Sequence, residues 1–110
     1  MGKKEVERRL RKRQTMRVPV AVRTRDGSLQ ADGYTRDLSS NGMFLYTKSK
    51  IAAGSELEIV MILPAEFTQS DKRWVCCQAS VVRVEAAPED GNFGVAARIY
   101  GMQILPEIIG

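Results

Sequence analysis

Two arginines four positions apart, Arg13 and Arg17, end a basic segment at the start of the chain. A guanidinium group donates several hydrogen bonds from a planar fork, so it can bind a phosphate, or the O6 and N7 edge of a guanine, with two bonds at once. The same plane can stack on a base. The pair is therefore a candidate element for binding an anionic ligand that contains a base, although arginines at this spacing more often form a solvated face.

A second group of polar residues occupies positions 37–42, Asp-Leu-Ser-Ser-Asn-Gly. An ionised carboxylate only accepts hydrogen bonds, so Asp37 could take both N–H groups from the Watson–Crick edge of guanine. Ser39 can donate to a phosphate or a base, and Gly42 permits a positive φ and a close approach of the backbone. Alone, the segment is also typical of a turn in which Asp37 or Ser39 bonds nearby backbone.

In this order, the two groups resemble the motifs of the PilZ domain family: Arg-x-x-x-Arg just before the first strand, then Asp-x-Ser-x-x-Gly at a turn between strands. Residues 18–20, Val-Pro-Val, look like the family's first strand. Residues 93–99, Phe-Gly-Val-Ala-Ala-Arg-Ile, are similar to its closing strand. The resemblance covers nearly the whole chain, and it implies a six-stranded antiparallel barrel that binds cyclic di-GMP.

The resemblance also implies roles for the motif residues. Arg13 and Arg17 would grip guanine edges and phosphates as the arm folds over the ligand, while Asp37 and Ser39 hold guanine from the barrel and Gly42 shapes the turn. Weaker, supporting candidates are Arg9, Lys12, Ser40, Asn41 and Arg98. Many relatives have arginine at the position of Lys12, and lysine supplies charge but no planar fork. One cyclic di-GMP and a stacked pair therefore both stay open.

The rest of the chain predicts an all-β fold. Apolar residues in alternation, separated by turn residues such as Asp26-Gly27, predict six strands. They run from residue 16 onward, then over about 29–37, 43–46, 57–63, 74–86 and 93–100. Six short antiparallel strands favour a closed or nearly closed barrel, because closure removes unpaired edges. Pro19 fits an edge or a bulge.

The predicted organisation has three parts: a basic arm at residues 1–12, flexible or partly helical, a barrel at 13–102 and a short tail at 103–110. The net charge is +4, from 17 Lys and Arg against 13 Asp and Glu. Residues 1–17 contain eight of the basic and two of the acidic side chains, so they carry +6 and the remainder carries −2. The arm therefore attracts anions, whereas the slightly acidic body argues against a general nucleic-acid groove.

Catalysis is not supported by the side chains available. The chain has no histidine, and its two cysteines, Cys76 and Cys77, are adjacent and do not form a metal-ligand spacing. We expect two reduced thiols, one of them in the core. No apolar run reaches the ~18 residues that span a bilayer, and no apolar signal peptide is visible at the start. We therefore expect a cytoplasmic protein that is not an enzyme and needs no cofactor.

The favoured hypothesis is a bacterial-type receptor whose loose arm closes over cyclic di-GMP and so builds a new surface for an unidentified protein partner. Two alternatives remain. One is a PilZ-like module that no longer binds nucleotide and only docks to a protein. The other is a general nucleic-acid-binding barrel, which the low aromatic content of 6% disfavours.

Overall fold

Seven antiparallel strands form one sheet in the computed structural model, which describes residues 3–67, 72–87 and 91–105. The strands are β1 (Gln14–Thr15), β2 (Pro19–Thr24), β3 (Gln30–Leu38), β4 (Gly42–Thr47), β5 (Glu56–Leu63), β6 (Arg73–Ala87) and β7 (Asn92–Ile104). One helix, α1 (Lys3–Arg9), precedes them, and a short 3-10 helix, η1 (Ala65–Phe67), follows β5. The six longer strands correspond to the six that the sequence predicts.

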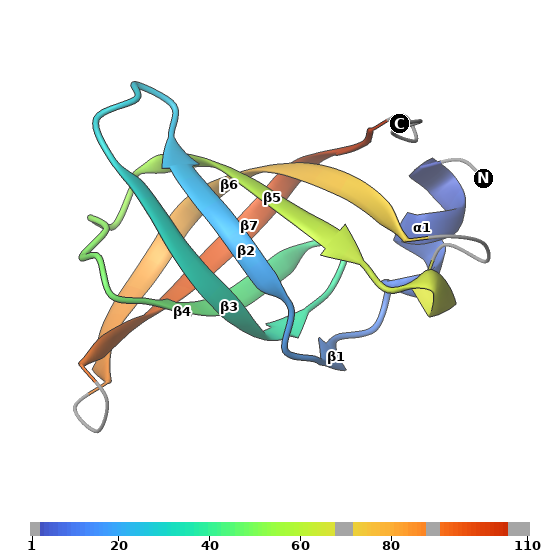
Figure 1. Ribbon diagram of the computed structural model, residues 1–110, viewed down its shortest axis with the longest axis horizontal. Coiled ribbons are helices and arrows are strands. Elements are labelled where there is room, and N and C mark those ends of the chain that lie inside the picture. Colours follow the sequence, from blue (N-terminus) through green and yellow to red (C-terminus); the bar gives the residue numbers. More distant parts are fainter. Residues whose placement is uncertain (1–2, 68–71, 88–90, 106–110) are drawn as a thin grey trace.

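The sheet closes on itself. Its order is β3-β2-β5-β6-β7-β4, and β4 pairs back with β3, which gives a closed six-stranded barrel (Figure 1). The short strand β1 is additional, and alternation of residue types did not predict it. It pairs with Asp37 and Leu38 at the end of β3, beyond the part of β3 that pairs with β2. This pairing places the chain that follows α1 directly beside the 37–42 motif.

Period-two alternation sets the inner face of the barrel. On β6, the predicted inward set of Val75, Cys77, Ala79 and Val81 is buried, and β5 buries Leu57, Ile59, Met61 and Leu63. Both cysteines are free, and Cys77 lies in the core, as expected for one of the two. Cys76 is buried as well, which the sequence did not predict. Burial raises the pKa of the Cys77 thiol to about 12, so Cys77 acts as a small apolar core residue.

Helix α1 covers one end of the barrel (Figure 1). Val6 and Leu10 are both 0% exposed and belong to the core. Of the arm that we expected to be flexible or partly helical, Lys3–Arg9 is helical, and Val6 and Leu10 anchor the arm to the barrel. In the described part of the chain, none of the helices has the length and apolar character required to cross a membrane.

Two local predictions were wrong. Gln103 and Ile104, assigned to the tail, continue β7, because β6 is long enough to pair with them at Cys76 and Val75. Residues 106–110 of the predicted tail lie outside the described residues. Pro19 sits neither on an edge strand nor at a bulge but begins β2, another position where a missing N–H is tolerated. The predicted turn at residues 26–27 is present, with Gly27 at φ 78°.

Candidate ligand-binding site

Ser39 holds the turn between β3 and β4. Its hydroxyl accepts hydrogen bonds from the amides of Gly42, at 3.1 Å, and Asn41, at 3.3 Å. The Ser39 amide donates to the carbonyl of Gly42 at 2.8 Å, and the side chain is buried. Ser39 therefore shapes the turn from within. The ligand contact suggested for it stays a prediction.

Gly42 leaves room for Arg13 beside the sheet. It begins β4, opposite Arg98 of β7. A Cβ at this position would lie 3.2 Å from Nη2 of Arg13 and 3.3 Å from the carbonyl oxygen of Ala97. The positive φ that the sequence suggested is absent, since the described glycines with positive φ are Gly27, Gly54 and Gly91. The lack of a side chain at Gly42 lets the Arg13 guanidinium approach the sheet.

Asp37 binds two arginines at once. Its Oδ1 accepts from Nη1 of Arg13, and its Oδ2 accepts from Nε of Arg36 at 2.9 Å. The Asp37 side chain is 10% exposed, whereas the two arginine side chains are about half exposed. Burial raises the pKa of Asp37, but the hydrogen bonds from Arg36 and Arg13 outweigh it and hold the pKa below its usual value. The carboxylate is therefore ionised at neutral pH, and it orients both guanidinium groups.

These two arginines border a hollow of about 340 Å³ on the outer face of the barrel. Arg83 of β6 and Arg98 of β7 border it from the other side, and Ala96 and Ala97 are among the small residues between them. Arg83 is paired only loosely, with Glu85 at 3.8 Å. Four guanidinium groups against one buried carboxylate make this hollow suitable for a ligand with more than one negative charge.

A row of aromatic side chains leads away from the hollow across β3 and β4. The Arg36 guanidinium lies 3.8 Å from the ring centroid of Phe44, and Phe44 meets Tyr46 edge-on at 5.4 Å. Tyr46 contacts Tyr34 at 5.5 Å. At the far end, the guanidinium of Arg17 lies 3.9 Å from the ring centroid of Tyr34. The row therefore connects the hollow with Arg17.

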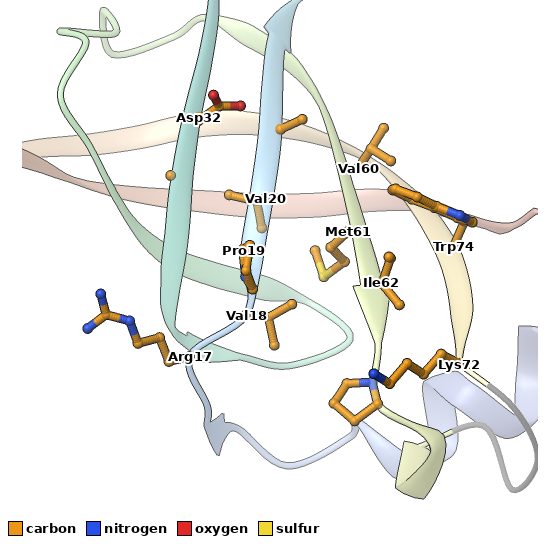
Figure 2. A pocket seen from close by; sticks show the side chains of 13 residues that line it. Arg17, Val18, Pro19, Val20, Asp32, Val60, Met61, Ile62, Lys72 and Trp74 are labelled. Atoms are coloured by element: carbon orange, nitrogen blue, oxygen red, sulfur yellow. The ribbon is translucent and has the colours of Figure 1, made fainter.

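The two motif arginines do not converge, contrary to expectation. Arg13 lines the arginine hollow, but Arg17 lines a different one on the outer face of β2 (Figure 2). The cause is β1, which lies between them. An extended chain advances ~3.3 Å per residue, so four positions separate the two backbones by ~13 Å.

The supporting candidates fall into two groups. Asn41 and Arg98 line the hollow. Arg9 donates to the carbonyl of Glu66 at 3.4 Å, and Lys12 is exposed and does not line the hollow. The amide of Ser40 donates to the carbonyl of Leu10 at 2.7 Å, which ties the end of the arm to the motif turn.

Sequence reasoning missed two arginines of the hollow. Arg36 precedes Asp37 and faces outward, so its position beside the motif could have signalled it. Arg83 could not be found this way, because β6 and β7 shift register between Val81 and Arg83. After such a shift, simple alternation no longer predicts which residues face a neighbouring strand's site.

The comparisons with known proteins agree with this architecture. The model of the PilZ domain family matches residues 7–106. The structure of the inhibitor of motility of Bacillus subtilis (MotI/DgrA) is similar with a TM-score of 0.67 and 15% identity, over 83% of this chain and 42% of that one. This chain thus spans less than half of that protein's length.

The PilZ domain of CeSA from a cellulose-synthesizing bacterium is similar with a TM-score of 0.54 and 23% identity, over 82% of each chain. A search of curated proteins found no significant match. At these identities the two structures establish the shared fold, and the family model, which matches most of the chain, establishes the family. This chain is a member of the PilZ domain family, a family of cyclic di-GMP receptors.

Proposed function

We propose that this chain binds cyclic di-GMP at the arginine hollow. The observation that carries the proposal is the convergence of Arg13, Arg36, Arg83 and Arg98 on one hollow beside the Asp37 motif. Cyclic di-GMP has two phosphodiester charges and two guanines. Guanidinium groups can bind the phosphates with paired hydrogen bonds and can also bind or stack on the bases.

Asp37 does not need to release its arginines for this to occur. A guanidinium has five N–H donors, so Arg13 can keep its bond to Asp37 and still donate to a phosphate. Arg36 can do the same from its half-exposed side chain. Asp37 then acts first as the group that positions two phosphate-binding arginines. The carboxylate has about four lone-pair sites, so a direct bond between Asp37 and guanine requires access past the two arginines and not the loss of either arginine bond.

Arg17 is the part of the proposal that requires movement. The sequence hypothesis has the arm closing over the ligand, and here Arg17 must leave Tyr34 to reach the arginine hollow. A single ligand in the hollow would require Arg17 to move there, whereas a stacked pair that extends along the aromatic row would bring the ligand closer to Arg17. Closure of this segment would change the surface offered to a protein partner, which is how the ligand would signal.

Isothermal titration of the intact chain with cyclic di-GMP tests binding directly. We expect Arg13→Ala, Arg17→Ala and Asp37→Ala each to weaken affinity at least tenfold, since a charged hydrogen bond contributes about 1.5–3 kcal/mol. No binding by the intact chain at ligand concentrations of tens of micromolar defeats the proposal. Unchanged affinity in Arg17→Ala alone defeats arm closure and restricts the site to the hollow.

Arg36→Ala and Arg25→Ala form a matched pair for the location of the site. Both are exposed arginines, but Arg25 lies away from the hollow, where it contacts the Tyr100 hydroxyl at 3.5 Å. We expect Arg36→Ala to lose affinity about tenfold and Arg25→Ala to keep it. Equal losses of affinity in the two variants would mean that only the net charge of the chain matters, and would contradict this location of the site.

A polynucleotide is the second candidate ligand, favoured by one observation. Aromatic side chains beside arginines, as in the row Phe44, Tyr46 and Tyr34, are features that single-strand-binding surfaces use. A gel-shift series with single-stranded RNA and DNA at rising salt separates the two. Tight binding of either strand that cyclic di-GMP does not displace would favour the polynucleotide.

A further inference from the structure

A second and larger hollow, of about 700 Å³, lies on the outer face of β2, β5 and β6 (Figure 2). It shares no lining residue with the arginine hollow. Outward positions of an antiparallel sheet that faces water are normally polar. Here they are Ala21, Val60, Ile62 and Trp74, and the side chains of Ile62 and Trp74 are 39% and 38% exposed.

Where β2 pairs with β5 and β5 pairs with β6, the apolar outward residues lie in one half of the strands; the exposed Val82 of β6 lies beyond that stretch, at the arginine hollow. Toward the other half, the outward residues are polar and paired with one another. Arg23 of β2 bonds Glu58 of β5 at 3.0 Å, and Ser80 of β6 bonds Glu56 at 2.7 Å. The same three strands therefore carry an ordinary solvated surface and, next to it, an apolar one. An apolar patch with this sharp limit is typical of a surface that another molecule covers.

The rim of the hollow carries charge at both ends. Along the strands, Figure 2 shows Arg17 and Lys72 toward one end of the hollow, on opposite sides of it, and the carboxylate of Asp32 toward the other end. An occupant with apolar side chains in its middle and a carboxylate at the Arg17 and Lys72 end would match this distribution.

Backbone pairing limits how the occupant can dock. Strand β2 pairs with β3 and β5, and β5 pairs with β2 and β6. Where residues 20–24 pair with residues 57–61, both strands have a partner on each side, and at the end near the hollow only Ile62 and Leu63 of β5 extend beyond this pairing. An edge of two residues is too short to pair with an added strand. The occupant must dock through side chains, which favours an amphipathic helix laid in the hollow. We propose that this hollow binds an amphipathic helix of another protein, with acidic residues at the end that faces Arg17 and Lys72.

A displayed library of random peptides of about 16 residues, long enough for about four helical turns, tests this with the intact chain. Binders are selected on the wild-type chain and counter-selected on Ile62→Glu, whose change lies on the exposed surface. We expect the surviving peptides to share apolar residues at positions i, i+3 or i+4 and i+7, with Asp or Glu gathered at one end. No surviving peptide, or survivors that are basic or lack this spacing, would overturn the proposal.

Trp74 is the one tryptophan of the chain, so its fluorescence reports occupation of the hollow. A selected peptide should change this signal. Lys72→Glu should weaken the peptide at least about fivefold, equivalent to about 1 kcal/mol. Tyr100→Ser, which alters another exposed apolar residue away from the hollow, should not. Equal losses of peptide affinity in Lys72→Glu and Tyr100→Ser would contradict the placement of the peptide in this hollow.

Sedimentation of the wild-type chain tests whether a second copy of this chain, and not another protein, occupies the hollow. A dimer that Ile62→Glu and the milder Ile62→Ser both abolish would identify a second copy of this chain as the occupant and overturn a heterologous partner. Circular dichroism confirms that each variant keeps its fold. Titration with cyclic di-GMP serves as a separate control, because failure of peptide binding with intact nucleotide affinity counts against this proposal alone.

Discussion

At the scale of single residues, the candidate site depends on Asp37 more than on any one arginine. Its two oxygens bind Arg13, which directly follows the arm, and Arg36 of β3, two residues that are far apart in sequence. Removal of this carboxylate leaves two like charges close together without a common partner. A loss of affinity in an Asp37 variant therefore measures the positioning of the arginines as well as any direct contact with guanine.

Stability as a function of pH isolates the structural part of this role. The folded-state pKa of Asp37 is lowered, since the bonds from Arg36 and Arg13 outweigh its burial. A lowered pKa stabilises the fold above the unfolded value of about 3.9, and this stabilisation disappears as pH falls through the folded-state pKa. We predict that Asp37→Asn lowers the free energy of unfolding by about 1 kcal/mol at pH 7, a modest figure because both arginines are half exposed.

Urea unfolding of wild type and Asp37→Asn between pH 7 and pH 3 checks this prediction. The difference in unfolding free energy should be constant near neutral pH and should shrink below about pH 4. A difference that stays constant down to pH 3 would show that the carboxylate charge does not contribute.

At the scale of elements, alternation was a sufficient guide to the long strands and an insufficient one to the site. Inward residues follow period two along β5, and along β6 as far as Val81, so the barrel could be predicted. The separation of Arg13 from Arg17 depends on β1, a strand of two residues with no apolar pattern. Arg83 depends on a register shift between β6 and β7. Both arise from pairing between distant segments, which local sequence does not encode.

The pairing of β3 with β4 leaves no room for a side chain at Gly33. A Cβ there would lie 2.3 Å from the backbone carbonyl oxygen of Tyr46, which cannot rotate away. At Gly101 the closest atom, also at less than 2.5 Å, is the side-chain oxygen of Gln78, which can. We predict that Gly33→Ala lowers the free energy of unfolding by at least ~2 kcal/mol, and Gly101→Ala by less.

Thermal or urea unfolding of the two alanine variants provides the comparison. Gly33→Ala should also weaken ligand binding, because it displaces β4 at Tyr46 within the aromatic row. Similar stability in the two variants would mean that the β3–β4 pair adjusts its spacing without cost.

Leu10, which directly follows helix α1, links the arm to the motif turn. Leu10 is 0% exposed, and its carbonyl accepts the Ser40 amide at 2.7 Å. Truncation of a fully buried leucine to alanine removes apolar contacts and leaves a cavity, which costs about 2–5 kcal/mol. We predict that Leu10→Ala falls in the lower part of this range, since the site is near the end of the barrel.

Binding measured on the same variant shows whether the helix matters for the ligand. If α1 positions Arg13 through this anchor, Leu10→Ala should weaken cyclic di-GMP binding severalfold at a temperature where the barrel is still folded by circular dichroism. Full affinity in a destabilised variant would separate the helix from the site.

At the scale of the whole molecule, the uneven charge is the feature that ties arm and barrel together. Residues 1–17 carry +6 and the rest carries −2, and the arginine hollow lies where the arm meets the barrel. A polyanionic ligand that enters there is attracted by the arm as well as by the residues that it touches. Net charge alone, at +4, would not distinguish this arrangement from a uniformly basic surface.

Salt separates attraction at a distance from direct contact. Exposed charges are screened beyond about 10 Å at 0.1 M ionic strength, and contacts inside a hollow are screened less. We predict that the affinity for cyclic di-GMP falls as NaCl rises from about 0.05 M to about 0.5 M, and that Arg98→Ala, which removes a charge from the hollow, lowers both the affinity and its dependence on salt. Arg25→Ala, which removes the same charge elsewhere, should change neither by more than about twofold. Titrations of the three proteins across this salt range decide the matter, because identical slopes would mean that the overall field of the chain, and not the arginine hollow, attracts the ligand.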